Sequence, residues 1–181
     1  YLKKQNKLAN DTLVVTTMSN IGLHVAAKEY GIDLAITDVG DRYVIEEMKK
    51  SGHNLGGEQS GHMIFLDYNT TGDGTLSSLI VSKIVKEEGK TLSEQSALMT
   101  TYPQVLINVE VRNEVKNKFM ENDEIRAEIE RLEKLMNGTG RVLIRPSGTQ
   151  PLVRVMLEGK DEGQIRELAQ GLADLIKEKL A

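Results

Sequence analysis

The sequence predicts an α/β doubly wound domain followed by a smaller α+β domain, in which helices pack on one face of an antiparallel sheet. In the first part, short β-branched runs alternate with amphipathic helical stretches, the pattern of a parallel sheet with crossover helices. In the second part, a strand and a helix are followed by two adjacent strands and a final helix, which indicates antiparallel pairing. We therefore expect two domains, residues 1–100 and 101–181.

The composition excludes several classes of protein. With 39% hydrophobic and 28% charged residues, the 181-residue chain is typical of a globular protein with a real core. Cysteine is absent, which excludes disulfides and thiolate metal sites. A net charge of −4 and the absence of Trp argue against a nucleic-acid partner. No apolar run approaches the roughly 20 residues that a membrane-spanning helix needs, so we expect no membrane partner.

The elements of the first domain follow from apolar periodicity. The β-branched runs predict strands over 12–17, 33–37 and 63–66, and helical spacing predicts helices over 20–30, 42–50 and 76–88, with a short helical link over 93–99. Ser19 and Asp41 are the expected N-caps of the first two helices. Residues 1–8 are interpreted as the last turns of a helix whose beginning is missing, so we expect the chain to be a fragment of a longer protein.

The second domain is expected to begin with a strand over 105–111. Asn122 or Asp123 then caps a helix that ends at Met136. The runs 142–144 and 152–157 predict a β-hairpin, and a helix over 161–180 follows it, with apolar residues at helical spacing along one face. Both helices are amphipathic, so both should cover the same face of the sheet.

A polar turn joins the two strands of this hairpin and reads Arg-Pro-Ser-Gly-Thr-Gln-Pro over residues 145–151. Gly148 can adopt a positive φ angle, which would let neighbouring backbone N–H groups turn toward one point. Arg145 and, on the returning strand, Arg154 offer planar forks suited to phosphate oxygens. These residues predict a phosphate-binding loop, and the alternative is an ordinary polar turn, because glycine-containing polar turns are common.

This turn resembles the phosphate-binding loop in the last domain of the phosphohexomutases. Gln150 stands where the phosphoglucosamine branch of that family usually has Glu. The change is isosteric and removes a negative charge, so it should not harm anion binding, and the role of Gln150 itself stays open. The resemblance implies that phosphate is bound by five residues, namely Arg145, Ser147, Gly148, Thr149 and Arg154.

A second glycine-rich stretch, Gly-Glu-Gln-Ser-Gly-His over residues 57–62, leaves several polar side chains free on a tightly bent backbone. Carboxylate, amide and hydroxyl groups suit adjacent sugar hydroxyls, which need both donors and acceptors. The alternative is a flexible surface turn. The stretch resembles the sugar-recognition loop in the third domain of the same family, which implies that Glu58, Ser60 and His62 bind the substrate. Two such motifs in the family's order are far more specific than either alone.

A third stretch, Val-Gly-Asp-Arg-Tyr over residues 39–43, is similar to the corresponding loop of the phosphoglucosamine branch. Arg42 is a candidate auxiliary catalytic residue that reaches the substrate or assists charge and proton handling. The alternative is that Asp41 simply caps a helix and Arg42 is solvated.

Together these motifs identify the chain as the third and fourth domains of a phosphohexomutase. The resemblance implies interconversion of glucosamine 6-phosphate and glucosamine 1-phosphate in a bacterial cytoplasm, through a phosphoserine enzyme and a 1,6-bisphosphate, for UDP-N-acetylglucosamine synthesis. It also implies a magnesium cofactor. Neither the family's serine loop nor its Asp-Gly-Asp-x-Asp-Arg metal loop occurs in this sequence. The implied partners are therefore a phosphosugar and the missing N-terminal domains, and the chain alone should bind substrate without turning it over.

Two other functions are compatible with the same residues. The chain is either a non-catalytic phosphosugar- or anion-binding module with a regulatory role, or a structural fragment whose loops are plain surface turns. A serine loop and an acidic metal loop upstream would distinguish the enzyme from the regulatory module. Loss of anion binding in Arg145→Ala would exclude the structural fragment.

Overall fold

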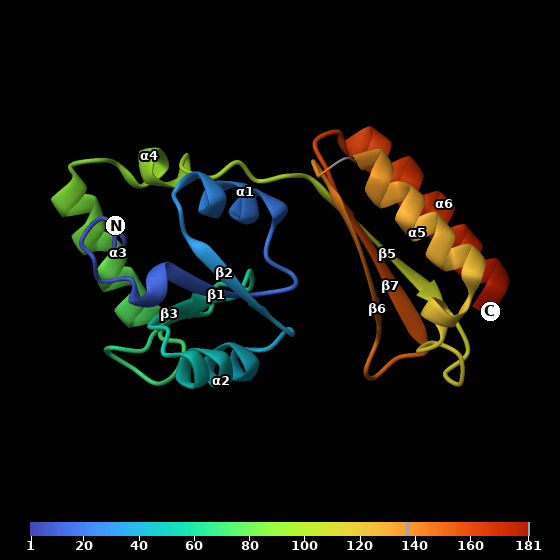
Figure 1. Ribbon diagram of the computed structural model, residues 1–181, viewed down its shortest axis with the longest axis horizontal. Helices are drawn as coiled ribbons and strands as arrows, with labels where there is room; N and C mark the ends of the chain where they lie inside the picture. Colours follow the sequence, from blue (N-terminus) through green and yellow to red (C-terminus); the bar gives the residue numbers. More distant parts are fainter. Residues whose placement is uncertain (137, 181) are drawn as a thin grey trace. The chain divides into compact units, whose positions relative to one another are not determined.

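Two separate β-sheets organise the chain, as the computed structural model in Figure 1 shows. The structure describes residues 1–136 and 138–180. Contacts between Cα atoms divide the chain into two units, Tyr1–Thr101 and Tyr102–Ala181, each with its own sheet. The predicted fold class, an α/β unit followed by an α+β unit, is confirmed.

The N-terminal unit contains a mixed sheet with the strand order β2-β1-β3-β4. Its strands are β1 (Thr12–Thr16), β2 (Asp33–Thr37), β3 (Leu55–Gly57) and β4 (Met63–Phe65). Strand β1 pairs in parallel with both β2 and β3, whereas β3 and β4 are antiparallel. The sequence analysis missed β3, so the glycine-rich stretch that it assigned wholly to a loop is in fact a β-hairpin.

Helices α1 (Ile21–Glu29) and α2 (Asp41–Ser51) lie on opposite sides of this sheet (Figure 1). Val44 and Met48 of α2 are completely buried against Val14 and Ile64 of the strands. Helix α2 approaches β3 so closely that a Cβ atom on Gly56 would lie 2.7 Å from both Met48 and Val44. Only glycine fits at this position, which explains why β3 carries a residue that strands normally avoid.

Two further helices complete the N-terminal unit. Helix α3 (Gly74–Glu88) is capped by Asp73, whose Oδ1 accepts a hydrogen bond from Leu76 N at 2.9 Å. Helix α4 (Leu92–Ser96) begins with a capping box formed by Thr91 and Glu94. Both helices agree with the sequence prediction, although α4 is shorter than expected.

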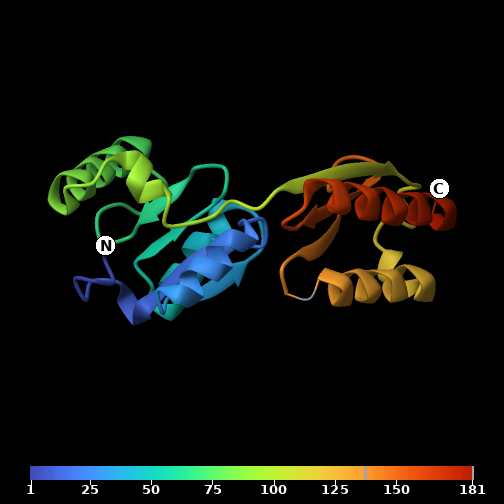
Figure 2. The same ribbon diagram turned by 90° about the horizontal axis from the view of Figure 1, so that it is seen from above.

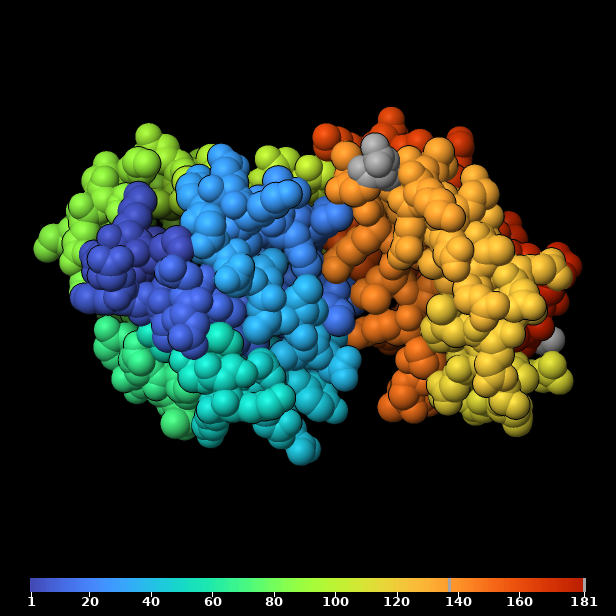
Figure 3. Space-filling model, in the orientation of Figure 1, coloured from blue at the N-terminus to red at the C-terminus, as the bar shows by residue number. Residues whose placement is uncertain are grey.

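The ends of three other predicted elements differ. The side chain of Asn20, not Ser19, caps α1 by accepting from Gly22 N at 2.9 Å. Gly40, with φ of 135°, occupies the N-cap of α2, and Asp41 is its first helical residue. Residues 1–8 form turns instead of a helix, followed by a 3₁₀ turn, Ala9–Asp11. Apart from Leu8, which is buried, they lie on the surface of their unit, as the dark blue atoms of Figure 3 show.

The C-terminal unit is built on an antiparallel sheet with the strand order β5-β7-β6. Its strands are β5 (Gln104–Glu110), β6 (Arg141–Pro146) and β7 (Leu152–Glu158). Helices α5 (Asp123–Met136) and α6 (Glu162–Leu180) lie side by side on one face of the sheet (Figures 1 and 2), and a 3₁₀ turn, Phe119–Glu121, precedes α5. The side chain of Asn122 accepts hydrogen bonds from the first turn of α5, so Asn122 is the cap.

The core of this unit lies between the helices and the sheet. Alternate residues of β7 face the helices, and the helices contribute the apolar stripes that the sequence predicted. The completely buried members of this core are Ile125, Leu132, Val153, Val155, Leu157, Ala169, Leu172 and Ile176. The other face of the sheet carries the alternate set, which includes Arg145 and Arg154.

Candidate functional site

The predicted sugar loop, residues 57–62, comprises the last residue of β3 and the turn 58–62 that joins β3 to β4. Glu58 N donates to His62 O at 2.9 Å, and Gly61 N donates to Glu58 O at 3.0 Å. Gly61 has a φ of 95°, a conformation that other residues rarely adopt, so the glycine is needed to close the turn. The turn brings Glu58, Ser60 and His62 together.

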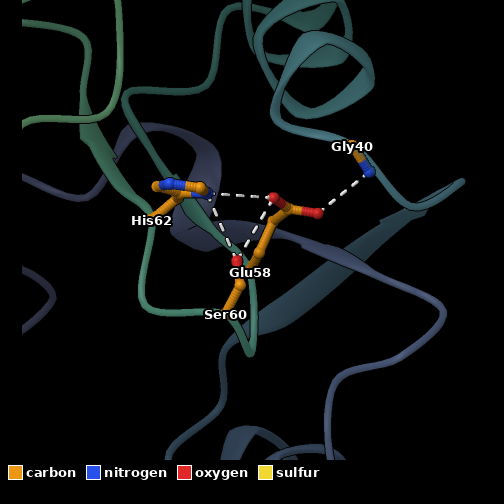
Figure 4. Close-up of polar contacts among 4 residues, drawn as sticks. All are labelled: Gly40, Glu58, Ser60 and His62. Atoms are coloured by element: carbon orange, nitrogen blue, oxygen red, sulfur yellow. Dashed lines mark hydrogen bonds and ion pairs between the residues drawn. The ribbon is translucent and has the colours of Figure 1, made fainter.

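The carboxylate of Glu58 lies at the centre of this group (Figure 4). Its Oε1 accepts a hydrogen bond from Gly40 N at 2.9 Å. Its Oε2 lies 3.4 Å from His62 Nδ1 and 3.5 Å from Ser60 Oγ. The Glu58 side chain is only 10% exposed, whereas that of His62 is 61% exposed. Glu58 is thus an anchored acceptor, and Ser60 and His62 are the members of the group that solvent reaches freely.

The contact with Gly40 ties this loop to the N-terminus of α2. The negative carboxylate lies where the helix dipole is positive and where backbone N–H groups lack helical partners. Sequence reasoning missed this contact because Gly40 and Glu58 belong to different predicted elements. It gives Glu58 a structural role in addition to its expected role in substrate binding.

Arg42 lies in the first turn of α2. Its Nε donates to Glu46 Oε1 at 2.7 Å, and its side chain is 79% exposed. The hydrogen bond and the charge of Glu46 raise the pKa of Arg42, which therefore stays protonated. The structure places this guanidinium beside a carboxylate of its own helix, at the end of α2 that Glu58 contacts.

The predicted phosphate loop, residues 145–151, comprises the last two residues of β6 and the turn 147–151 that connects β6 to β7 in the C-terminal unit. Ser147 is 6% exposed, and its N–H donates to Leu152 O at 2.9 Å. Its hydroxyl oxygen accepts from Gln150 N at 3.1 Å. Because an accepting hydroxyl still has its own hydrogen to donate, Ser147 both closes the turn and keeps a donor.

One expectation for this loop is wrong. Gly148 is not among the residues with positive φ, so it does not form the left-handed nest that the sequence analysis predicted. A Cβ atom added to Gly148 would meet nothing within 4 Å. At this position the glycine therefore provides open space beside the backbone and not a special backbone conformation. Within the described residues, neither Gly148 nor Thr149 hydrogen bonds to another residue, so both amides are free to donate.

The two arginines predicted to bind phosphate are brought together by strand pairing. Arg145 of β6 is directly opposite Arg154 of β7, and Asn108 of β5 is opposite Arg154 on the other side. Directly paired residues share one face of a sheet. This row crosses the three strands on the face opposite the helices. Arg145 and Arg154 lie near the end of the β6–β7 hairpin that carries the phosphate loop. The loop and the row together supply cationic, hydroxyl and backbone donors.

Lys116, which the sequence analysis did not single out, also contacts this loop. Its Nζ donates to Ser147 O at 2.7 Å and lies 3.4 Å from Gln150 O. Lys116 belongs to the segment between β5 and α5 and is 31 residues from Ser147 in the sequence. No local motif marks such a contact, so only the fold identifies it.

The described part of the chain contains no cluster of three or more His, Cys, Asp or Glu side chains suited to hold a metal ion. It also contains no helix that is both long enough and apolar enough to cross a membrane.

Comparison with known proteins follows the division into two units. Residues 1–102 match a family model described as phosphoglucomutase/phosphomannomutase, alpha/beta/alpha domain III. Residues 106–175 match the model of the C-terminal domain of the same family. The phosphoglucosamine mutase of Clostridioides difficile (strain 630) is 69% identical over 180 residues, which is 99% of this chain and 40% of that protein. The chain thus spans well under half the length of this curated relative.

Solved structures share the fold at low identity. The N-acetylphosphoglucosamine mutase of Aspergillus fumigatus superposes with a TM-score of 0.79 at 22% identity, covering 96% of this chain and 39% of that one. A structure of the same fungal enzyme in complex with GlcNAc-6P and magnesium gives a TM-score of 0.74 at 21% identity, covering 95% of this chain and 42% of that one.

Proposed function

Because the chain belongs to the phosphoglucomutase/phosphomannomutase family, we propose that it is the substrate-binding C-terminal part of a phosphoglucosamine mutase. The whole enzyme would interconvert glucosamine 6-phosphate and glucosamine 1-phosphate through a phosphoserine and a 1,6-bisphosphate, on the route to UDP-N-acetylglucosamine. We propose that it acts in the bacterial cytoplasm. The close identity to the C. difficile relative along this whole chain supports the choice of sugar.

The phosphate loop is the observation that carries this proposal. Arg145 and Arg154 lie side by side by strand pairing, and the amides of Gly148 and Thr149 have no hydrogen-bond partner within the described residues. The Ser147 hydroxyl keeps a hydrogen to donate. Guanidinium groups, amides and a hydroxyl are the donors that bind phosphate oxygens in proteins. In this chain they would hold the phosphate group that is not being transferred.

The loop 58–62 would bind the sugar. The hydroxyl of Ser60 and the imidazole of His62 are exposed, and both lie within 3.5 Å of the fixed carboxylate of Glu58. Neighbouring sugar hydroxyls donate and accept at once, and this group offers both functions. Arg42 is proposed as an auxiliary residue at the same end of α2. Holding both ends of the substrate would supply the orientation that phosphoryl transfer requires.

Magnesium would supply charge stabilisation during phosphoryl transfer in the whole enzyme. The described residues do not fit it, since they contain no cluster of three acidic or imidazole ligands. We assign the metal to the Asp-rich loop of the family, which this sequence lacks. No step proposed for this chain therefore goes through a metal.

A calorimetric titration of glucosamine 6-phosphate into this chain tests the proposal. Arg145→Ala should weaken binding by about tenfold or more, since a charge-assisted hydrogen bond contributes about 1.5–3 kcal/mol. Arg126→Ala, which removes a surface arginine of α5, is the matched control and should bind like the wild type. Equal affinity of Arg145→Ala and the wild type would exclude the loop as the phosphate site.

A further inference from the structure

We propose that Lys116 is a positioning residue of the phosphate loop, which orients the backbone amides that bind phosphate without touching the phosphate itself. The inference rests on the proposed function of that loop and adds a residue outside both sequence motifs. Its basis is the contact of Lys116 Nζ with Ser147 O at 2.7 Å and with Gln150 O at 3.4 Å.

The contact with Lys116 fixes the orientation of one peptide unit of the loop. The carbonyl of Ser147 and the N–H of Gly148 belong to the same peptide, and no described peptide bond is cis. In a trans peptide the C=O and the N–H point in opposite directions. Because the carbonyl points at Lys116, the N–H of Gly148 points away from it. That N–H has no partner in the described residues, so it is presented on the side where an anion would bind.

The opposite end of the turn also contacts Lys116. The carbonyl of Gln150 accepts from Leu152 N at 2.9 Å and also faces Lys116. The next residue, Pro151, has no N–H of its own, so this peptide offers only a carbonyl. Two carbonyl oxygens of one short loop therefore face the same ammonium group. Without that group the Ser147 carbonyl would lose this hydrogen-bond partner, and the orientation of the 147–148 peptide would be less firmly held.

Lys116 belongs to a folded segment that is attached to both the core and the loop. Its neighbour Val115 packs against the core of the C-terminal unit. The backbone N–H of Lys116 donates to Arg112 O at 3.1 Å, and Lys118 N donates to Val115 O at 2.8 Å. Just before this segment, Val111 N donates to Pro151 O at 3.0 Å. The segment is thus a folded support for the loop, and its lysine is held in place before any ligand binds.

The test is a titration of the chain with inorganic phosphate, followed by the ¹H–¹⁵N signals of Gly148 and Thr149. In the wild type both signals should move on titration. Lys116→Met, which removes the ammonium but keeps the apolar stem, should weaken phosphate affinity by about tenfold. It should also shift the Gly148 amide signal in the phosphate-free protein, because the peptide is no longer held.

Three variants separate a positioning role of Lys116 from a simple loss of charge or packing. Lys116→Arg keeps a cationic donor and should restore most of the affinity, a rescue that an unspecific structural role would not give. Lys116→Gln keeps a neutral donor and should lose less affinity than Lys116→Met, which provides a second measurement should the methionine variant fold poorly. Lys118→Met removes an exposed lysine of the same segment and should leave the affinity unchanged.

The outcomes are distinct. If the wild type binds phosphate at the loop and Lys116→Met binds it equally well, the positioning role is wrong while the proposed function stands. The same conclusion follows if Lys118→Met loses as much affinity as Lys116→Met, because the effect would then be general electrostatics. If phosphate moves no loop signal in the wild type, both the phosphate site and the role of Lys116 are overturned.

Discussion

Arg145 and Arg154 are directly opposite each other on the antiparallel strands β6 and β7. Like charges at directly paired positions destabilise a sheet by some tenths of a kcal/mol. A phosphate dianion bound between the two guanidinium groups would turn this repulsion into attraction. The pair thus slightly lowers the stability of the free protein and is proposed to stabilise the complex with phosphate.

This relationship predicts opposite effects of Arg154→Gln. In phosphate-free buffer, the free energy of unfolding of the C-terminal unit should rise by about 0.2–1 kcal/mol, because the cross-strand repulsion is removed. Phosphate affinity should fall by about tenfold. Urea denaturation and phosphate titration measure the two effects. Arg166→Gln on α6, which removes a surface ion pair with Glu162, is the control and should leave affinity unchanged. A variant that loses stability as well as affinity would show that the two arginines do not repel each other.

Gly148→Ala should lower the affinity for phosphate without changing the stability of the fold. The glycine does not need a positive φ, and an added Cβ atom would meet nothing within 4 Å in the free protein. The melting temperature of the C-terminal unit should therefore stay within about 2–4 °C of the wild-type value, which corresponds to a change of less than about 0.5 kcal/mol. Phosphate affinity should fall, because the methyl group occupies the space beside the free amides. If binding is unchanged, phosphate does not approach the loop at Gly148.

Most of the fold followed from local patterns. The β-branched runs gave β1 and β2, and the apolar stripes of α5 and α6 gave the helical layer of the C-terminal unit. Strand β3 was missed because its sequence, Leu-Gly-Gly, has little strand propensity. It forms by pairing with β1 and β4, and the glycine at position 56 leaves room for the close packing of α2. The cap of α2 was misassigned for a related reason, since Asp41 has the usual capping side chain but Gly40 takes the position.

The candidate binding residues of both loops could be predicted from the sequence, whereas the residues that hold these loops in place could not. Glu58 and Ser147 stood out in short motifs. The partners that fix them, Gly40 and Lys116, come from other elements and were not predicted. A sequence motif identifies candidate ligand-binding groups, but the fold determines which side of each peptide faces the ligand. The conformation of Gly148 was misjudged for the same reason.

The contact between Glu58 and Gly40 predicts a dual role for this carboxylate. Glu58→Ala should free the Gly40 amide, speed its hydrogen exchange by about tenfold or more and lower the stability of the N-terminal unit by about 1–2 kcal/mol. Glu58→Gln keeps an acceptor oxygen and should protect the amide almost as well as the wild type. Glu46→Ala on the same helix is the control and should not affect it. Unchanged protection in Glu58→Ala would mean that this bond does not anchor the loop.

A buried charge in the C-terminal unit gives a further prediction. Glu158 of β7 is completely buried and bonds to Arg141 of β6 and Gln104 of β5, which flank it in register. Arg141→Ala should lower the free energy of unfolding by about 3 kcal/mol, because it leaves a buried carboxylate without its counter-charge. Arg126→Ala breaks an exposed pair with Asp123 and should cost at most about 1 kcal/mol. Similar costs in urea denaturation would mean that Glu158 does not depend on its ion pair.

The central claim is that this chain binds one phosphosugar through two loops with separate tasks. A ¹H–¹⁵N titration with glucosamine 6-phosphate, with unphosphorylated glucosamine in parallel, tests it most directly. The account predicts that the phosphosugar shifts the signals of both 145–149 and 57–62, and that glucosamine alone leaves the first loop unmoved. Shifts confined to residues outside both loops, or no shifts at any concentration up to about 10 mM, well above the usual enzymatic KM range, would contradict it.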